Sequence, residues 1–526
     1  METPDSKGEQ VSHHVTGRFN IKRRTFVQSA AAAIATLSLP NPTVLASPNP
    51  RRAHIRADVE AVTGDGRTVI LTDAALADLR ARLRGSLLLA DDPGYDDARL
   101  ILNPAFDRHP ALIVQPTGVA DIRSAVEFAQ EHGGLLLAVK CGGHSYSGQS
   151  TCDRGMQIDL VRFRDVRVDP VARTAWVTGG SLLGQVDHET MAHDLVTPLG
   201  TVSHTGVGGL VTGGGFGRLG RRFGLAIDNL RGVHVVTADG ELRRANAEEH
   251  PDLFWGVRGG GGNFGIVTSF EFRLHPMRRQ VMGGSIVFPI SRAREVLTVF
   301  GEYGPEAPDE LSFGCTMVQP PGDAPGIIEI GVCYSGRTSL LDQALAPLRA
   351  IGQPLSDTIR PVDYVALQRA GDTTDPRAIT GYLKSGFIRR LGPDLVTAIV
   401  DGFRTDPRRT TALFFQQASG AIGLIAPDAT AFSQRDAFAN MLVASMWPFG
   451  EDGSEHIQAT REYWSGLERF TYGFYVNDLE PDMTPATIQA TYRHNHERLV
   501  AVKHRYDPTN LFRMNANVKP TVGRER

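Results

Sequence analysis

The sequence has little cysteine, no surplus of either charge and no long hydrophobic run, and each absence excludes a class of protein. Four cysteines in 526 residues are too few for a disulfide-held scaffold, and no two of them form the CxxC pair typical of a metal site. Lys and Arg number 55 and Asp and Glu 58, so no excess of cations is present to neutralise nucleic-acid phosphates. The apolar runs fall short of the about twenty residues that a membrane-spanning helix needs. We therefore expect neither nucleic-acid binding nor a stable membrane association.

The overall composition is that of a folded globular protein. Apolar residues make up 41% and charged residues 21% of the chain. At about 150 residues per domain, the length predicts two to four domains.

The N-terminal segment has the three parts of an export signal in the correct order. Arg23 and Arg24 lie in a basic region, residues 30–39 form a short apolar stretch, and a small-residue cleavage site ends at Ala46. The arginine pair resembles the twin-arginine class, whose machinery exports proteins already folded. We expect residues 1–46 to be such a signal peptide and the mature protein to be periplasmic or extracellular. The alternative is a tail with a chance arginine pair.

The remaining sequence alternates between strand-like and helix-like stretches, which predicts an α+β fold. Up to residue 276 the expected strands are residues 111–114, 135–139, 175–177, 233–237 and 266–272, and the expected helices are residues 119–131 and 181–193. Beyond it, the expected strands are residues 283–288 and 326–334, and the expected helices are residues 291–303, 340–351 and 487–506. Asp507-Pro508 ends the last helix, because the residue before a proline is disfavoured in the α conformation.

Four glycine-rich segments lie close together in the sequence, at residues 141–145, 205–209, 213–217 and 259–265. Glycine allows backbone N–H groups to approach an anion closely, so several such loops can surround a pyrophosphate without basic side chains. Each segment alone is compatible with a simple tight turn. Together they predict a binding site for a large ligand.

Two motifs within the chain are rejected on their context. Gly215 to Gly220 matches GxGxxG and is followed by Asp239, but further glycines and not a strand precede it, so we do not assign a nicotinamide site. His188-Glu189 resembles the start of HExxH, but Ala192 stands where the second histidine is required. We expect no metal site.

The chain resembles the berberine-bridge-enzyme-like, vanillyl-alcohol-oxidase-type FAD oxidoreductases. The resemblance rests on residues 110–116, 140–145, 206–210, 228–229, 259–265 and 506–515, in that order. It implies a two-domain α+β FAD-linked oxidase fold. An FAD-binding domain at 56–276, with a PCMH-type core from about residue 106, would precede a substrate domain with an antiparallel sheet at 277–480. Residues 481–526 would return to the FAD domain.

The resemblance also implies a covalently bound FAD. His144 matches the histidine that bonds to the flavin 8-methyl carbon. The other positions matching the cofactor-binding segments are Lys140, Cys141, Gly142, Gly143, Ser145, Thr201, Val202, His204, Thr205, Gly208, Gly209, Gly265, Ile266, Val267, Asn515 and Asn517. Val202 stands where doubly linked members carry cysteine, so we expect no cysteinyl bond. Thr205 stands at the position that resembles the oxygen gate and leaves oxidase or dehydrogenase behaviour open.

The catalytic base is the point at which the chain departs from the family. Tyr475 begins the Tyr-x-Asn motif, but Asp478 stands where many members carry a second tyrosine. A tyrosinate or a carboxylate within hydrogen-bond reach could accept the substrate proton. We expect Tyr475 and Asp478 to act in catalysis, with Tyr472 as a further candidate and Lys384 as a cationic neighbour. For each of them, a purely structural role at the domain interface is the alternative.

The expected function is an exported FAD-dependent oxidoreductase. It would take hydride from a small alcohol, sugar-like or amine substrate and pass the electrons to oxygen or another acceptor. The alternatives are a flavin dehydrogenase that reacts poorly with oxygen, and a flavin- or ligand-binding protein without catalysis. The absent tyrosine at position 478 keeps this last alternative open.

Overall fold

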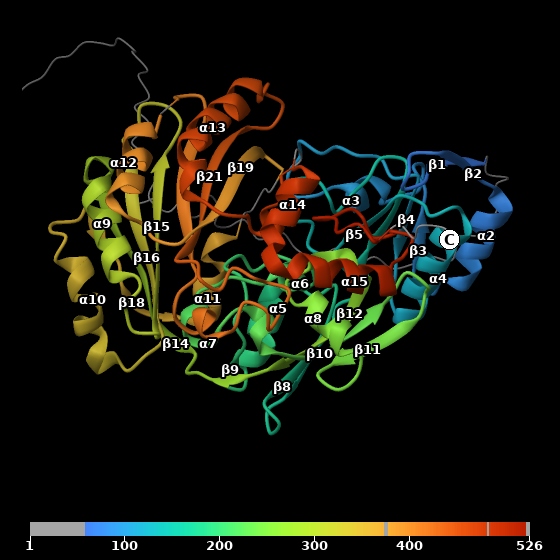
Figure 1. Ribbon diagram of the computed structural model, residues 1–526, viewed down its shortest axis with the longest axis horizontal. Coiled ribbons are helices and arrows are strands. Elements are labelled where there is room, and N and C mark those ends of the chain that lie inside the picture. The colour runs from blue at the N-terminus through green and yellow to red at the C-terminus, as the bar shows by residue number, and fades with distance from the viewer. Residues whose placement is uncertain (1–57, 373–376, 405, 481–482, 522–526) are drawn as a thin grey trace, which may run out of the picture.

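The computed structural model describes residues 58–372, 377–404, 406–480 and 483–521, which form three main sheets and the helices around them (Figure 1). The mixture of helices with largely antiparallel sheets confirms the α+β prediction. The predicted export signal lies outside the described residues. Within the described ranges, no helix combines the length and the apolar character needed to cross a membrane.

The first sheet has four strands in the order β3-β4-β6-β5, and β4, β6 and β5 run parallel. Its strands are β3 (Ser86–Leu88), β4 (Leu112–Gln115), β5 (Leu137–Lys140) and β6 (Met156–Asp159). Helix α4 (Val119–Glu131) packs on it through apolar residues at helical spacing, among them Ile122, Val126 and Ala129. Gly133 and Gly134 follow at φ +82° and +73°, a conformation that ends the helix and favours glycine.

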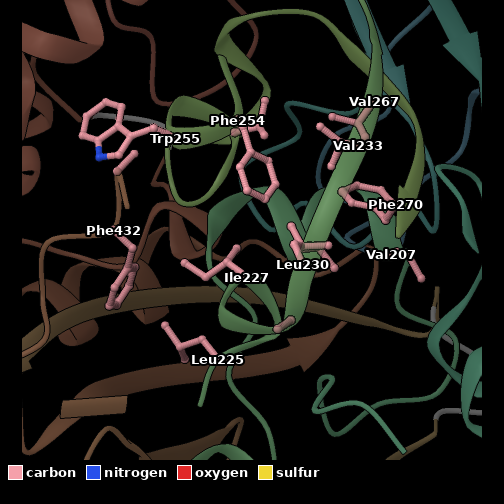
Figure 2. Packing of buried hydrophobic residues seen from close by; sticks show 14 of the residues in the cluster. Val207, Leu225, Ile227, Leu230, Val233, Phe254, Trp255, Val267, Phe270 and Phe432 are labelled. Atoms are coloured by element: carbon pink, nitrogen blue, oxygen red, sulfur yellow. The ribbon is translucent and has the colours of Figure 1, made fainter. Parts of the chain in front are cut away.

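The second sheet has five antiparallel strands in the order β11-β10-β12-β8-β7. They are β7 (Val166–Asp169), β8 (Thr174–Thr178), β10 (Leu230–Val236), β11 (Leu242–Asn246) and β12 (Ile266–Arg273). Figure 2 shows part of the core beneath this sheet, where Val233, Val267 and Phe270 belong to one buried cluster with Phe254 of helix α8 (Pro251–Val257). Phe432, from the part of the sequence after residue 277, belongs to the same cluster, so residues from both halves of the sequence contribute to it.

The third sheet has eight antiparallel strands, and four helices pack on its outer face (Figure 1). Its strands are β14 (Gln280–Pro289), β15 (Leu311–Gln319), β16 (Ile327–Tyr334), β17 (Ser356–Asp357), β18 (Arg360–Asp363), β19 (Ile379–Ile388), β20 (Thr410–Gln417) and β21 (Ala439–Pro448). The helices are α9 (Ala293–Tyr303), α10 (Leu341–Arg349), α12 (Pro393–Gly402) and α13 (Ser454–Leu467). Their apolar faces and the third sheet form one buried cluster, distinct from the two clusters that contain the first and second sheets.

Shorter elements connect these layers. The paired strands are β1 (Val59–Val62) with β2 (Thr68–Leu71) and β9 (Leu195–Val196) with β13 (His275–Pro276). The remaining helices before the C-terminal segment are α2 (Asp73–Arg82), α3 (Tyr95–Arg99), α5 (Leu183–Met191), α6 (Val207–Gly213), α7 (Gly220–Phe223) and α11 (Tyr364–Gln368). The rejected GxGxxG motif follows the end of α6 and not a strand, which agrees with the context that excluded a nicotinamide site.

The C-terminal segment contains two helices where one was predicted. Helix α14 (Pro485–Tyr492) and helix α15 (His496–Tyr506) are separated at Arg493, whose φ is +51°. The guanidinium of Arg493 donates to Asp436 at 2.8 Å, and the Asn495 amide donates to the carbonyl of Pro427 at 2.8 Å. These tertiary bonds outweigh the local helical pattern, so the prediction of one continuous helix was wrong.

Lys503 anchors this C-terminal segment to the glycine-rich segment at residues 259–265. Its ammonium is fully buried and donates to the carbonyls of Asn263 and Phe512 and to the carboxylate of Asp507, at 2.8, 2.8 and 2.7 Å. Burial lowers its pKa to about 8, while Asp507 opposes that shift. Because all three ammonium protons are bonded, the buried charge is accommodated and the segment is fixed across the first half of the molecule.

Candidate functional site

A cavity of about 350 Å³ lies where the glycine-rich segments, the C-terminal segment and the inner face of the third sheet meet. This volume is within the range of cofactor pockets. Its lining includes Cys141, Gly142, Gly143, His144, Ser145, Thr205, Gly208, Gly209, Gly265, Ile266, Val267, Tyr475, Asp478 and Asn515 from the predicted site. Sequence segments more than 300 residues apart therefore converge on one space, as predicted.

Three glycines in the cavity wall leave room for something other than protein. A Cβ atom built on Gly209 or Gly261 would meet no protein atom within 4 Å, and one on Gly262 would meet only the Asn515 amide at 3.8 Å. Among the described residues that line the cavity, none is arginine or lysine. An anionic ligand would therefore be held by backbone N–H groups, which suits the pyrophosphate of FAD.

Polar atoms without a protein partner point to the same conclusion. The side-chain oxygens of Ser150 and Asn515 are buried and accept or donate no hydrogen bond within the chain, although both residues line the cavity. The Asn515 amide nitrogen does donate to the Phe512 carbonyl at 3.1 Å, which fixes the orientation of the side chain. Buried polar atoms normally have partners, so these two oxygens are available to a polar ligand in the cavity.

A Gly209→Ala substitution tests whether the bare backbone serves a ligand. Gly209 lies within helix α6, so alanine should raise the stability of the free protein by about 0.5–1 kcal/mol. The added methyl group would stand in the cavity space. We expect FAD affinity, measured by titration of the apoprotein, to fall on the order of tenfold or more. A tenfold fall corresponds to a loss of about 1.4 kcal/mol of binding free energy.

Gly466→Ala is the matched control for this experiment. Gly466 also lies within a helix, α13, with no atom within 4 Å of an added Cβ, but it is not part of the cavity wall. This variant should gain similar stability and bind FAD as the parent protein does. Equal FAD affinity in the two variants would contradict the assignment of the cavity.

His144 lies on the loop after β5 and presents both ring nitrogens to polar partners. Its Nε2 is 2.6 Å from Nδ1 of His204, and its Nδ1 is 3.3 Å from the Thr205 hydroxyl. Burial, and secondarily the neighbouring His204, lower its pKa to about 3. The ring is therefore neutral at physiological pH, which is the nucleophilic state that a bond to carbon requires.

Two neighbours of His144 in the sequence have structural roles. The Lys140 ammonium is not directed into the cavity: it donates to the backbone carbonyls of Ala98 and Leu100 and lies 3.5 Å from the Asp159 carboxylate. The Cys141 thiol donates to the Gly179 carbonyl at 3.0 Å, and burial raises its pKa to about 11. Cys141 is thus an unreactive thiol, and all four cysteines are free.

Some predicted cofactor residues do not reach the cavity wall. Thr201, Val202 and His204 belong to the loop before α6 but are not among the lining residues, and neither is Asn517. Val202 approaches Gly371 of the opposite half instead. The sequence motif located the correct loop, but it could not distinguish residues that face the ligand from those that support the loop.

Tyr475 is held in place by the residues around it. Its hydroxyl oxygen accepts hydrogen bonds from the Gly215 N–H at 2.8 Å and from the Asn477 amide at 2.7 Å. Burial raises the pKa of this phenol well above its ordinary value. A tyrosinate would therefore be strongly disfavoured, and the geometry gives Tyr475 the role of positioning the wall of the cavity.

Asp478 has the environment expected of a general base. It lines the cavity, and one of its carboxylate oxygens accepts a hydrogen bond from the Asn440 amide at 2.7 Å. Burial raises its pKa to about 7, while the bond from Asn440 opposes that shift. A carboxylate with a pKa near neutral pH can both accept and release a proton.

Tyr472, the further candidate for the base, and Lys384, its expected cationic neighbour, lie outside the cavity lining. The Tyr472 hydroxyl donates to Asp436 at 3.1 Å, and its ring lies 3.8 Å from the Arg389 guanidinium carbon. Lys384 forms an ion pair with Glu480. Neither side chain belongs to the cavity wall, and their expected parts in catalysis stay predictions.

The structure also adds residues that the sequence did not reveal. Tyr146 and Gln416 line the cavity near Asp478, and Asn440 connects the Gln416 and Asp478 side chains through its amide. Gln416 and Asn440 face each other across strands β20 and β21. No local motif marks them, since strand pairing alone brings them to the site.

Comparison with known proteins agrees with this geometry. A family model described as an FAD binding domain matches residues 110–246, and one described as berberine and berberine like matches residues 474–519. An FAD-linked oxidoreductase of Dictyostelium discoideum is 32% identical over 78% of this chain and 89% of that protein.

Two solved structures are similar along nearly their whole length. The structure of 6-hydroxy-D-nicotine oxidase from Arthrobacter nicotinovorans is 27% identical, with a TM-score of 0.76, and the match covers 84% of this chain and 98% of that one. The xylooligosaccharide oxidase of Myceliophthora thermophila C1 in complex with xylobiose is 25% identical, with a TM-score of 0.77, and the match covers 86% and 99%.

Proposed function

The chain belongs to the FAD-linked oxidoreductases, and we propose that it is an exported oxidase of a small alcohol, sugar-like or amine substrate with its FAD bonded to His144. It is an FAD-dependent oxidoreductase by family and fold. One observation carries the finer proposal. The neutral imidazole of His144 and the carboxyl group of Asp478, whose pKa is about 7, both lie in the wall of one glycine-lined cavity.

Different segments of this chain would bind different parts of the cofactor. The backbone of the segments at 142–145 and 205–209 would bind the pyrophosphate and the ring system, and Gly265 to Val267 would lie beside the adenine. Asn515 would supply its unpartnered oxygen to a polar group of the cofactor. When bound, FAD supplies the redox chemistry by accepting a hydride equivalent.

Asp478 would take the proton that leaves the substrate hydroxyl or amine. Asn440 holds the carboxylate in one orientation, and Tyr475 fixes the adjoining turn through the Gly215 N–H. Tyr146 stands beside the same carboxylate and contributes to the substrate side of the cavity. With Asp478 as the base in place of the absent tyrosine, the alternative of a binding protein without catalysis would lose its main support.

The substrate class follows from similar proteins and from this lining together. Those proteins are named as oxidases of hydroxynicotine and of xylooligosaccharides, and the second was solved with xylobiose. A panel of amines, sugars and alcohols, screened anaerobically for loss of the flavin absorption, would identify the class. Flavin that no member of the panel bleaches would favour the binding protein.

We propose oxygen as the electron acceptor, with hydrogen peroxide as the product. Turnover compared in oxygen and with an artificial acceptor would separate an oxidase from a dehydrogenase, the alternative that Thr205 leaves open. Residues 1–46 are proposed as a twin-arginine export signal, and residues 56–276, 277–480 and 481–526 as the FAD domain, the substrate domain and the returning segment.

The rate of substrate oxidation should depend on pH through Asp478. Its pKa is raised to about 7, so the carboxyl group is protonated and inactive as a base below pH 7 and ionised above it. We expect kcat/KM to rise tenfold per pH unit below about pH 7 and to level off above it. A rate that falls as the pH rises through 7 would contradict this role.

A further inference from the structure

We propose that a second cavity, at the edge of the third sheet, is the path by which the proton taken up by Asp478 leaves the protein. This inference rests on the proposed role of Asp478 as the base. The second cavity has a volume of about 280 Å³ and lies between the edge strand β19, helix α13 and helix α14 (Figure 1). A polar cavity of this size has room for several water molecules, which such a path requires.

The second cavity extends from the protein surface to a buried end. Glu468 and Thr487 in its wall are exposed, whereas Ser385 in the same wall has only 4% of its surface exposed. The Lys384 ammonium and the Glu480 carboxylate also belong to the wall and form an ion pair. Charged and hydroxyl groups therefore follow the cavity along its length, and such groups bind water.

The pairing of β19 with β21 places Ser385 on the face of the sheet that carries the base. Ser385 lies opposite Leu442, and Phe387 lies opposite Asn440. Because residues two apart in a strand share a face, Ser385 and Asn440 lie on the same face of the sheet. The Asn440 amide donates to the Asp478 carboxylate at 2.7 Å, so this face is the one that Asp478 contacts.

The hydroxyl group of Ser385 can connect Asp478 with the second cavity. Burial raises the pKa of Asp478 to about 7, the Ser385 hydroxyl lowers it and the Glu480 carboxylate raises it, so both groups lie near Asp478. The Ser385 oxygen is buried and forms no hydrogen bond of normal geometry within the described part of the chain. A hydroxyl group can both accept and donate a hydrogen bond, so Ser385 can bind Asp478 and a water molecule together.

The proton steps balance without a further reactant. The O–H or N–H bond of the substrate breaks, and its proton passes to the Asp478 carboxylate. The carboxyl proton then passes to the Ser385 oxygen while the Ser385 hydroxyl proton passes to water in the second cavity, which restores both side chains. Bound substrate and FAD would fill the glycine-lined cavity on the other side of Asp478, so the proton leaves in the direction away from them.

The test measures proton release separately from flavin reduction. The holoenzyme is mixed anaerobically with the best substrate of the panel, in weak buffer above pH 7, where Asp478 is ionised at the start. Flavin absorption reports reduction, and a pH-indicator dye reports the proton that reaches solution. The variants are Ser385→Ala and Ser385→Thr, of which the second keeps the hydroxyl group. Ser445→Ala is the control, since Ser445 is also buried in the third sheet and accepts a bond from Thr460 at 2.7 Å, but lies outside both cavities.

In the parent protein, we expect proton release to keep pace with flavin reduction. Ser385→Ala should reduce its flavin at the parental rate but release the proton on the order of tenfold or more slowly, because the hydroxyl group that carries it is absent. Ser385→Thr and Ser445→Ala should release the proton as the parent does.

A crystal structure of the parent protein gives a readout that does not depend on turnover. We expect ordered water at hydrogen-bond distance from the Ser385 oxygen, continuing through the second cavity towards Thr487. A cavity without ordered water at Ser385 would overturn the inference.

The kinetic outcomes distinguish this inference from the proposed role of Asp478. Proton release at the parental rate in Ser385→Ala would overturn the inference and leave Asp478 as the base. Equal slowing of flavin reduction and proton release would also overturn it, because Ser385 would then orient the base and not carry the proton. Flavin reduction at the parental rate in Asp478→Asn would overturn the assignment of the base and this inference with it.

Discussion

A His144→Ala variant is expected to bind FAD and to lose all of it on acid precipitation. The glycine-lined cavity and the unpartnered oxygen of Asn515 remain in this variant, so reversible binding should persist. The imidazole that would form the covalent bond is absent, so the precipitated protein should be colourless and lighter by one FAD than the parent. Intact mass and the absorption of pellet and supernatant measure both effects.

His234→Ala controls for the loss of an imidazole elsewhere. Its ring stacks on Trp176 at 5.2 Å between centroids, in the second sheet. This variant should keep acid-stable flavin. Acid-stable flavin in His144→Ala would show that another residue forms the bond.

An Asp478→Asn variant is expected to reduce its flavin on the order of 10²–10⁴ times more slowly than the parent with the best substrate of the panel. Asparagine has nearly the shape of aspartate and can still meet the Asn440 side chain, but it cannot accept the substrate proton. The pH dependence near 7 should disappear with it. Stopped-flow absorption under anaerobic conditions measures the rate without the oxygen reaction.

Tyr472→Phe is the control for this experiment, since the Tyr472 hydroxyl bonds to Asp436 and lies outside the cavity. It should reduce its flavin at the parental rate. If Asp478→Asn reduces its flavin as fast as the parent does, Asp478 is not the base.

The sequence predicted those features of the site that depend on backbone. Gly208, Gly209 and Gly265 line the cavity, and a glycine-rich pattern is a local signal. An added Cβ would meet the Gly179 carbonyl at Gly208 and the Val236 carbonyl at Gly265, whereas it would stand in open space at Gly209. Helix α4 could be placed with its bounds, because its apolar spacing and the glycines after it are local signals.

The sequence could not predict features that depend on distant partners. Asn440 and Gln416 reach the site through strand pairing, and nothing near them in the sequence indicates a function. Lys384 lies outside the cavity lining and pairs with the Glu480 carboxylate, a partner 96 residues away in the sequence that no local pattern indicates. The break at Arg493 likewise arises from its bond to Asp436.

The central claim, that the cavity is an FAD site with a covalent link, is tested most directly on the purified parent protein. Its absorption spectrum is recorded and the protein is precipitated with acid. The molecular mass of the protein in the pellet is then measured by intact mass spectrometry. The account predicts a yellow protein whose colour stays in the pellet, with the added mass of one FAD. A colourless protein that cannot be reconstituted with FAD would contradict the account.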